Sequence, residues 1–553
     1  MKKGIYTILL LITGFLSAQI TAQTCNKTID SSTPYIDWQN QAFNDIRPGD
    51  TVCLQAGNWN YIQLKNFHGT TDKPIVFINS GGTVIINTDH FVGIKIGNCS
   101  HVVFSGNGDS QAPYGFRILK VSKGAGMGID DYSTDIEISH VEISNTLLGG
   151  VYAKTDPTCN NFGATRDKFV MRNFSFHDNY VHDVPDEGLY IGNSHYAGLY
   201  LAGCDTTVLP HAMKGVFIFN NLVENTGFDG IQVSSADSNC QIHDNHINYD
   251  SQAERADQMS GIMIGGGSVC KTYNNTITNG KGDGIDVFGL GNMSIFNNLI
   301  VNAGLYYQPN DSSKLKHGIY IGTVTTAQSA VLGIYNNTIV SPKSFGITLN
   351  NTELQKTRII NNLITGPGKF AEDGERAFIN SNISDTRIEK SNNYLNNDIN
   401  QVQFISYNSG NYDLKPGSPA VNYGTDLTAE GVTFDILGRS RPFHDYFDAG
   451  AFESHDSTAD ISLLKTGDIE QFNVYPNPAR NLLNVSFQLK SARKIQVSLV
   501  DAAGKELLQH SIDVKNNQLV NVQFQLLNIS NGFYFIKLQT NKGTSAIPVI
   551  IKK

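Results

Sequence analysis

Three acidic side chains recur at the same position of a repeated strand motif. Glu187, Asp229 and Asp283 each stand directly before a Gly, and a short stretch of alternating apolar residues follows that Gly. If the motifs stack as neighbouring coils about 4.8 Å apart, the carboxyl groups form a row. Like charges so close resist ionising together, which raises the pKa of one group and suits it to act as a general acid. Such a row indicates glycoside hydrolysis or oxygen ligation of Ca²⁺, although Glu-Gly and Asp-Gly are also ordinary turn signals.

A second row lies at the centre of the same motif. The residue after each Gly and the one two further on are apolar, so the residue between them points outwards from the core. The Tyr rings in this row have flat apolar faces that suit stacking on sugars. His317 stands in the acidic row, and His195 lies in a loop nearby. The residues that we expect to bind substrate are Tyr152, Tyr190, Gln232, Asp286, His317, Tyr320 and His195.

Lys154 lies one step past the strand centre, where the next coils carry small residues. Asp130, in the run Gly128-Ile129-Asp130-Asp131, falls one coil earlier in the same row. In β-elimination from a uronic acid, a base removes the proton at C5 and a positive group neutralises the carboxylate. We assign Lys154 as the base, and Asp130 with Asp131 as the holders of a cation such as Ca²⁺.

Three segments interrupt the repeat, at residues 154–166, 195–211 and 252–258. Loops of this length carry function more often than the elements that they connect. We expect all three to wall a groove along one side. His182 and His195 are further acid or base candidates, although a single His is more often structural.

The strands that position these residues belong to a repeat between about residues 49 and 453. Its coils of about 23 residues or more, with strands of three to five residues, fit a parallel β-helix. A leucine-rich repeat would carry helical segments, and a propeller would need blades of about 40 residues. Asn tolerates a left-handed turn and can hydrogen-bond along a stack, and Gly permits a sharp turn into the next strand. The recurring Asn-Asn or Asp-Asn pairs end at Asn179, Asn221, Asn245, Asn275, Asn298, Asn337 and Asn362.

Both ends of this repeat resemble known β-helices. The start, Gly49-Asp50-Thr51-Val52-Cys53-Leu54 with Gly69-Thr70-Thr71-Asp72-Lys73-Pro74-Ile75, is similar to the first coils of alginate lyases and chondroitinase B. The closing residues Gly438-Arg439-Ser440-Arg441-Pro442 and Asp448-Ala449-Gly450-Ala451-Phe452-Glu453 are similar to the last segment of many such helices. The middle therefore resembles the right-handed parallel β-helices of the pectate-lyase-like superfamily, especially secreted Bacteroidetes members. These motifs specify fold and caps, and no catalytic motif of a well-defined lyase or hydrolase family is intact.

The first 23 residues are typical of a signal peptide. Lys2 and Lys3 precede an apolar run over residues 8–16, and small residues follow. The run is shorter than the roughly 20 residues that span a bilayer. We expect cleavage and export, with no transmembrane segment in the mature chain.

The last eighty residues alternate in strands, as at residues 482–489, 494–500 and 533–538, with a hairpin turn at 501–505. This pattern predicts a small β-sandwich. The segment resembles the C-terminal sorting domain of the Bacteroidetes type IX secretion system through Tyr475-Pro476-Asn477-Pro478, Gly504, Gly532-Phe533-Tyr534 and Lys537-Leu538. The resemblance implies the type IX machinery as a partner, followed by release or attachment to the cell surface. A carbohydrate-binding module is the alternative, but no cluster of aromatic residues favours it.

The whole chain reads as all-β, a right-handed parallel β-helix followed by a small C-terminal β-sandwich. We divide it into a signal peptide at 1–23, the helix with its caps at 24–454, a linker at 455–470 and the sorting domain at 471–553. The net charge of −9 makes a nucleic-acid partner improbable, since that role needs clustered Lys and Arg. Seven Cys in an exported chain leave at least one unpaired; we expect Cys25–Cys53 to pin the N-terminus and Cys159–Cys204 to close an insertion.

These observations favour an enzyme that cuts a polysaccharide. The resemblance of the first coils favours a lyase slightly, with Lys154 as base. The acidic row favours a glycoside hydrolase instead, with Glu187, Asp229 and Asp283 as acid, base or nucleophile. A non-catalytic, glycan-binding or adhesive surface protein is the remaining alternative, because a regular groove serves binding equally well.

Overall fold

The computed structural model describes residues 24–551, except 110, 290, 312–313, 323–329, 444–445, 455–468, 476–478, 490–492, 502–504, 516–517, 528 and 541–542. The predicted signal peptide, most of the predicted linker, the Pro476-Asn477-Pro478 motif and Gly504 with most of the 501–505 turn therefore lie outside the described residues. Among the residues that are described, no helix is long and apolar enough to cross a membrane.

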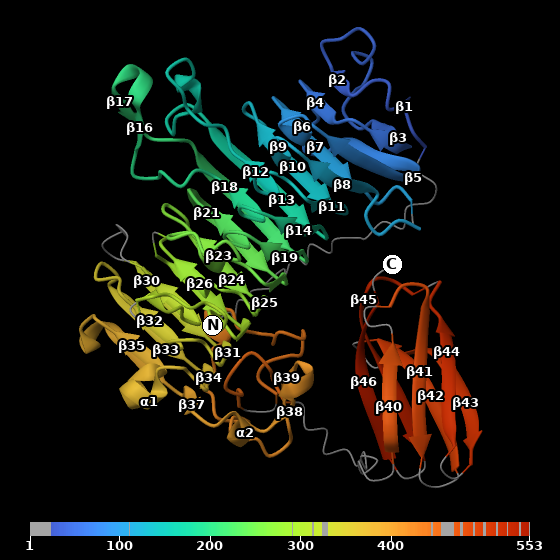
Figure 1. The fold of residues 1–553 in the computed structure, drawn as a ribbon, viewed down its shortest axis with the longest axis vertical. Helices are drawn as coiled ribbons and strands as arrows, with labels where there is room; N and C mark the ends of the chain where they lie inside the picture. The colour runs from blue at the N-terminus through green and yellow to red at the C-terminus, as the bar shows by residue number, and fades with distance from the viewer. Residues whose placement is uncertain are drawn as a thin grey trace, which may run out of the picture.

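Residues up to β37 wind into a parallel β-helix with two sheets (Figure 1). Sheet 1 has 12 strands, one from each coil, and consecutive strands pair in parallel. Its strands are β2 Tyr35–Asp37, β4 Ile62–Lys65, β6 Val92–Gly97, β9 Ala125–Asp130, β12 Val151–Ala153, β15 Leu189–Ile191, β20 Ile231–Val233, β23 Ser260–Ile264, β26 Asp283–Val287, β29 Ile319–Ile321, β32 Ile347–Leu349 and β35 Ile379–Ser381.

Sheet 2 has 23 strands, because most coils contribute two strands that meet at the Asn turn. They are β1 Lys27–Ile29, β3 Thr51–Trp59, β5 Ile75–Thr88, β7 Ser100–Ser105, β8 Phe116–Val121, β10 Thr134–Ser139, β11 Val141–Ser144, β13 Val170–His177, β14 Tyr180–Val184, β18 Ala212–Phe219, β19 Leu222–Thr226, β21 Ala236–His243, β22 His246–Asn248, β24 Cys270–Tyr273, β25 Thr276–Thr278, β27 Met293–Phe296, β28 Leu299–Val301, β30 Val331–Tyr335, β31 Thr338–Val340, β33 Lys356–Ile360, β34 Leu363–Thr365, β36 Ile388–Ser391 and β37 Tyr394–Asn396. Apolar side chains of both sheets fill one continuous core.

The two Asn residues of each pair have different structural roles. The first of each pair takes the left-handed conformation, as at Asn220 with φ 54° and Asn274 with φ 55°. The second is buried, and its amide bonds to its counterpart one coil on: Asn245 Nδ2 donates to Asn275 Oδ1 at 3.0 Å. The whole ladder contains Asn179, Asn221, Asn245, Asn275, Asn298, Asn337, Asn362 and Asn393. The predicted stack of Asn turns is confirmed.

The recurring Gly has a different reason from the one expected. At Gly188 and Gly230 no left-handed backbone is present; a Cβ would instead lie 2.5 Å and 2.6 Å from the carbonyl oxygen of the Gly in the next coil. Because no side chain fits between the coils there, Gly is required for close approach rather than for a sharp turn.

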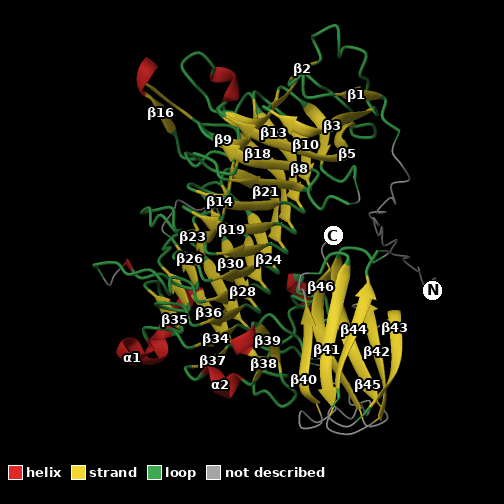
Figure 2. Cartoon of the chain, turned by 45° about the vertical axis from the view of Figure 1, so that its right-hand side comes forward, coloured by secondary structure: helices red, strands yellow, loops and turns green. Residues whose placement is uncertain are grey.

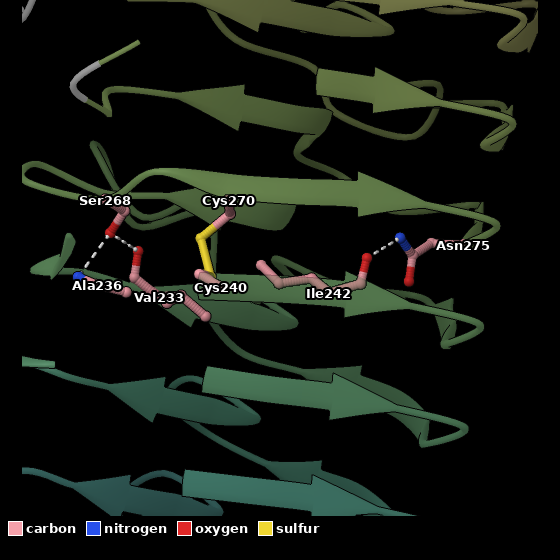
Figure 3. Close-up of a disulfide and its surroundings, with 7 residues drawn as sticks. All are labelled: Val233, Ala236, Cys240, Ile242, Ser268, Cys270 and Asn275. Atoms are coloured by element: carbon pink, nitrogen blue, oxygen red, sulfur yellow. Dashed lines mark hydrogen bonds between the residues drawn. A yellow bond between two sulfur atoms is a disulfide. The ribbon is translucent and has the colours of Figure 1, made fainter. Parts of the chain in front are cut away.

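Disulfides join coils as well as loops. The predicted pairs Cys25–Cys53 and Cys159–Cys204 are confirmed. A third, Cys240–Cys270, was not predicted; the two residues are in register on β21 and β24, so their side chains meet in the core (Figure 3). In the same view Ser268 accepts from Ala236 N and donates to Val233 O, and Asn275 donates to Ile242 O.

The remaining helical and irregular elements lie in loops and the C-terminal cap (Figure 2). They include the β16 Leu199–Leu201 and β17 Thr206–Val208 hairpin, α1 Phe370–Asp373, α2 Ile399–Val402, and the β38 Phe404–Ser406 and β39 Asn411–Leu414 hairpin. In the cap, Arg441 and Glu453 form a fully enclosed ion pair of 3.3 Å. Two of the closing residues singled out in the sequence therefore form an ion pair inside the cap.

The C-terminal domain is an antiparallel sandwich, as predicted. Its three-stranded sheet contains β40 Ile469–Tyr475, β41 Leu482–Leu489 and β44 Leu519–Gln525. Its four-stranded sheet contains β42 Arg493–Asp501, β43 Glu506–Val514, β45 Gly532–Thr540 and β46 Gly543–Ile551. Side chains such as Phe487, Val497 and Ile536 form a separate core between the sheets.

Candidate active site on the outer face of sheet 1

Strand register places the predicted central row on one outer face. Parallel pairs align the central residues of six consecutive strands, from β12 to β29. Flanking residues such as Leu189 and Ile191 are fully buried in the core. The outward positions predicted from alternation are therefore confirmed, while their role in binding stays a prediction. The aligned residues are Tyr152, Tyr190, Gln232, Met263, Asp286 and Tyr320.

The same row continues towards the N-terminus through two residues that the sequence analysis missed. Gly128 of β9 aligns with Tyr152, and Lys95 of β6 aligns with Gly128. The signal was present, since Gly93-Ile94-Lys95-Ile96 carries the same pattern of Gly, apolar, outward and apolar residues.

The acidic row runs along the amino ends of these strands and is closed to solvent. Glu187 is 3% exposed, Asp229 is 0% exposed, and Asp283 and the neighbouring Asp286 are 4% and 5% exposed. Burial raises the pKa of Glu187, and it raises the pKa of Asp229 and of Asp286 well above the ordinary range. For Asp286 the adjacent Asp283 adds to that rise. Burial thus favours the protonated forms of these carboxyl groups, in a region closed to solvent.

The cover comes from segments far away in the sequence. Gln258, in the loop before β23, donates to Glu187 Oε1 at 2.6 Å. Ser260 donates to Asp229 Oδ1 at 2.7 Å, whereas Asp229 Oδ2 has no partner among the described residues. Asp250, which the sequence did not single out, lies fully enclosed close to this row, and burial raises its pKa to about 6.

Asp283 has a cationic partner. Lys316 Nζ lies 2.8 Å from Asp283 Oδ2, and the backbone N–H of His317 donates to Asp283 Oδ1. The His317 ring stacks on Tyr320 with a centroid distance of 5.6 Å, and burial lowers its pKa. Asp286 Oδ1 has no partner among the described residues. A carboxyl group with a raised pKa and an ion-paired carboxylate therefore stand side by side.

The opposite edge, at the carboxyl ends of the strands, is more open. Lys154 Nζ lies 3.1 Å from Asp156 Oδ2 and 4.4 Å from the centroid of the Tyr190 ring. The side chain of Lys154 is 20% exposed and that of Asp156 is 47% exposed. Tyr152 and Tyr190 meet edge to face at 5.7 Å. Lys154 thus stands beside an aromatic surface that a ligand can reach.

One coil earlier, Asp130 and Asp131 enclose an ammonium group. Lys95 Nζ lies 3.1 Å from Asp130 Oδ2 and 3.2 Å from Asp131 Oδ2. A backbone hydrogen bond from Lys154 N to Ile129 O places Lys154 next to Asp130, as predicted. We call Lys95, Asp130, Asp131, Lys154 and Asp156 the lysine cluster.

A calcium ion does not fit the lysine cluster as it stands. Ca²⁺ takes about six to eight oxygen ligands. Lys95 engages only Oδ2 of each Asp, and Asp130 Oδ1 is buried with no hydrogen-bond partner among the described residues. The described part of the chain contains no group of three or more His, Cys, Asp or Glu residues that could hold a metal. Metal binding by Asp130 and Asp131 stays a prediction.

The two candidate His residues lie in different parts of the coil, and His195 is linked to the lysine cluster through Asn193, whose Nδ2 donates to Asp156 Oδ1 at 2.7 Å. His195 is exposed in the loop after β15, and its backbone N–H donates to Asn193 Oδ1. His182 belongs to β14 of sheet 2, where it contacts Asp183 at 2.7 Å and Glu142 at 3.5 Å. The outer face of sheet 1 therefore does not include His182.

The predicted loops do not all lie on one side. Residues 154–166 and 195–211 follow β12 and β15, whereas 252–258 precede β23. Since the strands are parallel, the first two loops wall the carboxyl edge and the third covers the amino edge, so the expectation of a single wall is wrong. Cys159–Cys204 ties the first two loops together, and the Arg166 guanidinium stacks 3.8 Å from the Tyr196 ring.

Comparisons with known proteins agree with this architecture. Residues 171–412 match the family of right handed beta helix regions, and residues 473–552 match the secretion system C-terminal sorting domain. The predicted right-handed parallel β-helix with a sorting domain is thus confirmed. The sorting domain marks the chain for secretion through the type IX system, after which it is released or attached to the surface.

Solved structures give only distant matches. The pectate lyase Pel9A is 15% identical with a TM-score of 0.37, covering 78% of this chain and 97% of that chain. An alginate lyase from Paenibacillus sp. str. FPU-7 is 13% identical with a TM-score of 0.31, covering 67% and 98%. The active domain of tailspike protein 2 from bacteriophage CBA120 is 12% identical with a TM-score of 0.28, covering 92% and 72%. No curated protein matches the chain.

Proposed function

We propose that this chain, a right-handed parallel β-helix protein exported through its sorting domain, binds and cleaves an acidic polysaccharide by β-elimination at the lysine cluster. The proposal depends on which of the candidate side chains are exposed to solvent, where a polymer can reach them. The side chains of Lys154 and Asp156 are 20% and 47% exposed, whereas the acidic row is 0–4% exposed. A polymer must reach the reacting groups, so the lysine cluster is the better candidate.

The proposed reaction uses Lys154 as the base. Its neutral amine accepts the proton from C5 of a uronic acid; the electron pair forms the C4–C5 double bond as the C4–O bond breaks. The leaving oxygen then takes a proton from solvent. The ammonium that forms on Lys154 is stabilised by Asp156 at 3.1 Å and by the face of Tyr190 at 4.4 Å. Charge that develops during the step is therefore met by groups already in place.

A substrate panel tests the proposal. The secreted protein is incubated with alginate, polygalacturonate, chondroitin and neutral glycans, and unsaturated products are followed by ultraviolet absorbance beside total reducing ends. Lys154→Met should lower the rate by about 10²- to 10⁴-fold, as loss of a general base does. Lys65→Met, which removes the same charge two coils before Asp130, is the control. Equal loss in both variants would contradict a role for Lys154 as base.

A second candidate function rests on Asp283 and Asp286. A carboxyl group with a raised pKa beside an ion-paired carboxylate is similar to the pairing that glycoside hydrolases use as acid and as base or nucleophile. This function requires the segments around Lys316 to open, because Asp286 is 5% exposed. Reducing ends without ultraviolet absorbance, abolished by Asp283→Asn, would favour hydrolysis over elimination.

A non-catalytic glycan-binding role is the third candidate. Its support is the aromatic surface of Tyr152 and Tyr190. Retention of a glycan without any product, unchanged by Glu187→Gln and Asp229→Asn, would favour it.

A further inference from the structure

Gly128 leaves an opening in the outward row of sheet 1. It stands between Lys95 and Tyr152 on consecutive strands. A Cβ built on Gly128 meets only Val92 Cγ2, at 3.5 Å, among the described residues within 4 Å. Lys95 and Tyr152 are separated by two strand spacings, about 10 Å. The row therefore has a gap one residue wide between the backbone positions of Lys95 and Tyr152. The Lys95 ammonium turns towards Asp130 and Asp131 at the carboxyl edge, and the Tyr152 hydroxyl towards Gly149 and Asp186 at the amino edge.

The Lys95 ammonium has an N–H donor left for a ligand. An ammonium group carries three donors. Two of them face Asp130 Oδ2 and Asp131 Oδ2, and the side chain of Lys95 is 29% exposed. A third donor is then available to an anionic group that approaches from the gap over Gly128.

We propose that a sugar ring bearing a carboxylate seats over Gly128, with its carboxylate on Lys95 and its apolar side towards Tyr152, and that this subsite needs no divalent cation. The proposal rests on the proposed function and assigns the residues that would hold the carboxylate of its substrate. It differs from the metal prediction for Asp130 and Asp131, because Lys95 supplies the positive charge that the predicted cation was to provide.

Neighbouring groups hold both side chains that border the gap. Asp130 and Asp131 hold Lys95 from one side, which fixes the position of its ammonium at the edge of the gap. Tyr152 is held in turn, since its hydroxyl accepts from Gly149 N at 3.1 Å and lies 3.3 Å from Asp186 Oδ2. Both walls of the subsite are thus positioned before any ligand arrives, which lowers the cost of binding.

Binding measurements on the secreted protein test the subsite. The probes are polygalacturonate and alginate, each beside a carboxyl-reduced form of the same polymer, in buffer with EDTA and with added Ca²⁺. Lys95→Met should weaken retention of the acidic polymers by about tenfold or more, as loss of a charged hydrogen bond does, with little change for the reduced ones. Lys65→Met should leave retention unchanged. EDTA should have no effect on the wild type.

The second test of the subsite fills the gap over Gly128 with a larger side chain. Gly128 has no left-handed backbone, and a Cβ there meets only Val92 Cγ2 at an ordinary contact distance of 3.5 Å. Gly128→Ala and Gly128→Val should therefore fold, which circular dichroism and thermal melting check. Gly128→Val should reduce retention of the acidic polymers about tenfold, with Gly128→Ala between it and wild type. Terbium luminescence adds a readout independent of glycans, since wild type should give no sensitised signal.

The outcomes separate the two proposals. If wild type retains acidic polymers but Lys95→Met and Gly128→Val retain them equally well, the subsite is wrong and the proposed function stands. If EDTA abolishes retention, or if terbium binds to wild type and is lost in Asp130→Asn, the metal prediction replaces the assignment to Lys95. If wild type neither retains nor cleaves any acidic polymer, the proposed function itself fails.

Discussion

Lys154 Nζ lies 4.4 Å from the centroid of the Tyr190 ring, on the next coil of the helix. A cation over an aromatic face gains about 0.5–2 kcal/mol, and the gain increases as water is excluded. The contact also holds Lys154 over the surface on which a sugar would lie. The proposed base and the proposed binding surface are therefore coupled through a single ring.

Replacing that ring separates its two contributions. Tyr190→Phe keeps the aromatic face and should change glycan retention less than about twofold, because only the bond to Ser194 is lost. Tyr190→Leu removes the face and should weaken retention about tenfold. Affinity electrophoresis in gels with polygalacturonate measures both. Equal effects of the two substitutions would show that the hydroxyl, not the face, matters.

The buried ion pair of Lys316 with Asp283 makes a prediction about stability. The two side chains are 18% and 5% exposed. Removing one partner of such a pair leaves an uncompensated charge and costs about 3–5 kcal/mol. Lys316→Met should therefore lower the free energy of unfolding by that amount in chemical denaturation. Lys271→Met, at an exposed position of β24, is the control and should change it by less than about 0.5 kcal/mol.

The Asn ladder predicts a large cost for a small change. In Asn275→Ala, Asn245 Nδ2 loses an acceptor and the carbonyl of Ile242 loses a donor, both in the buried turn. Leaving buried polar groups without partners costs about 1–3 kcal/mol for each group. A loss of about 2–5 kcal/mol is expected by chemical denaturation. Ser294→Ala, on the half-buried outward side of β27, should be almost neutral, and a similar loss there would contradict the ladder argument.

Much of the fold followed from local patterns in the sequence. The alternation around each Gly identified the outward positions of Tyr152 and Tyr190, and the Asn pairs identified the turns, because each signal lies within a few residues. The same pattern contained Lys95, which was overlooked because its strand comes before the regular Asn pairs begin. Local pattern was therefore sufficient for the framework and for the central row.

The features that the sequence did not predict depend on contacts between segments that are distant in the sequence. Gln258 donates a hydrogen bond to Glu187, which lies 71 residues earlier in the sequence. The local sequence around either residue gives no sign of that contact. The burial of the acidic row, on which our preference for elimination over hydrolysis rests, was therefore not predictable. The Cys240–Cys270 bond was missed for a related reason, since it depends on the register of two coils.

A last prediction concerns pH. His177 is mostly buried, which lowers its pKa, but hydrogen bonds and charge from Asp178 at 2.7 Å and Glu137 at 3.4 Å outweigh burial and raise the pKa from 6.5 to about 9. Because the folded-state pKa is above the unfolded one, the stabilisation is fully present below pH 6.5 and is lost as the pH rises through 9.

The size of this effect is at most about 3 kcal/mol, the equivalent of the shift in pKa. Denaturation of wild type at pH 6 and at pH 9.5 should show the decline, and His177→Gln should remove this part of it. The substituted protein should still fold, since the ring of Phe219 that stacks on His177 is also covered by His243 on its other face. A pH dependence identical in both proteins would show that His177 is neutral in the folded chain, and that Asp178 and Glu137 do not outweigh its burial.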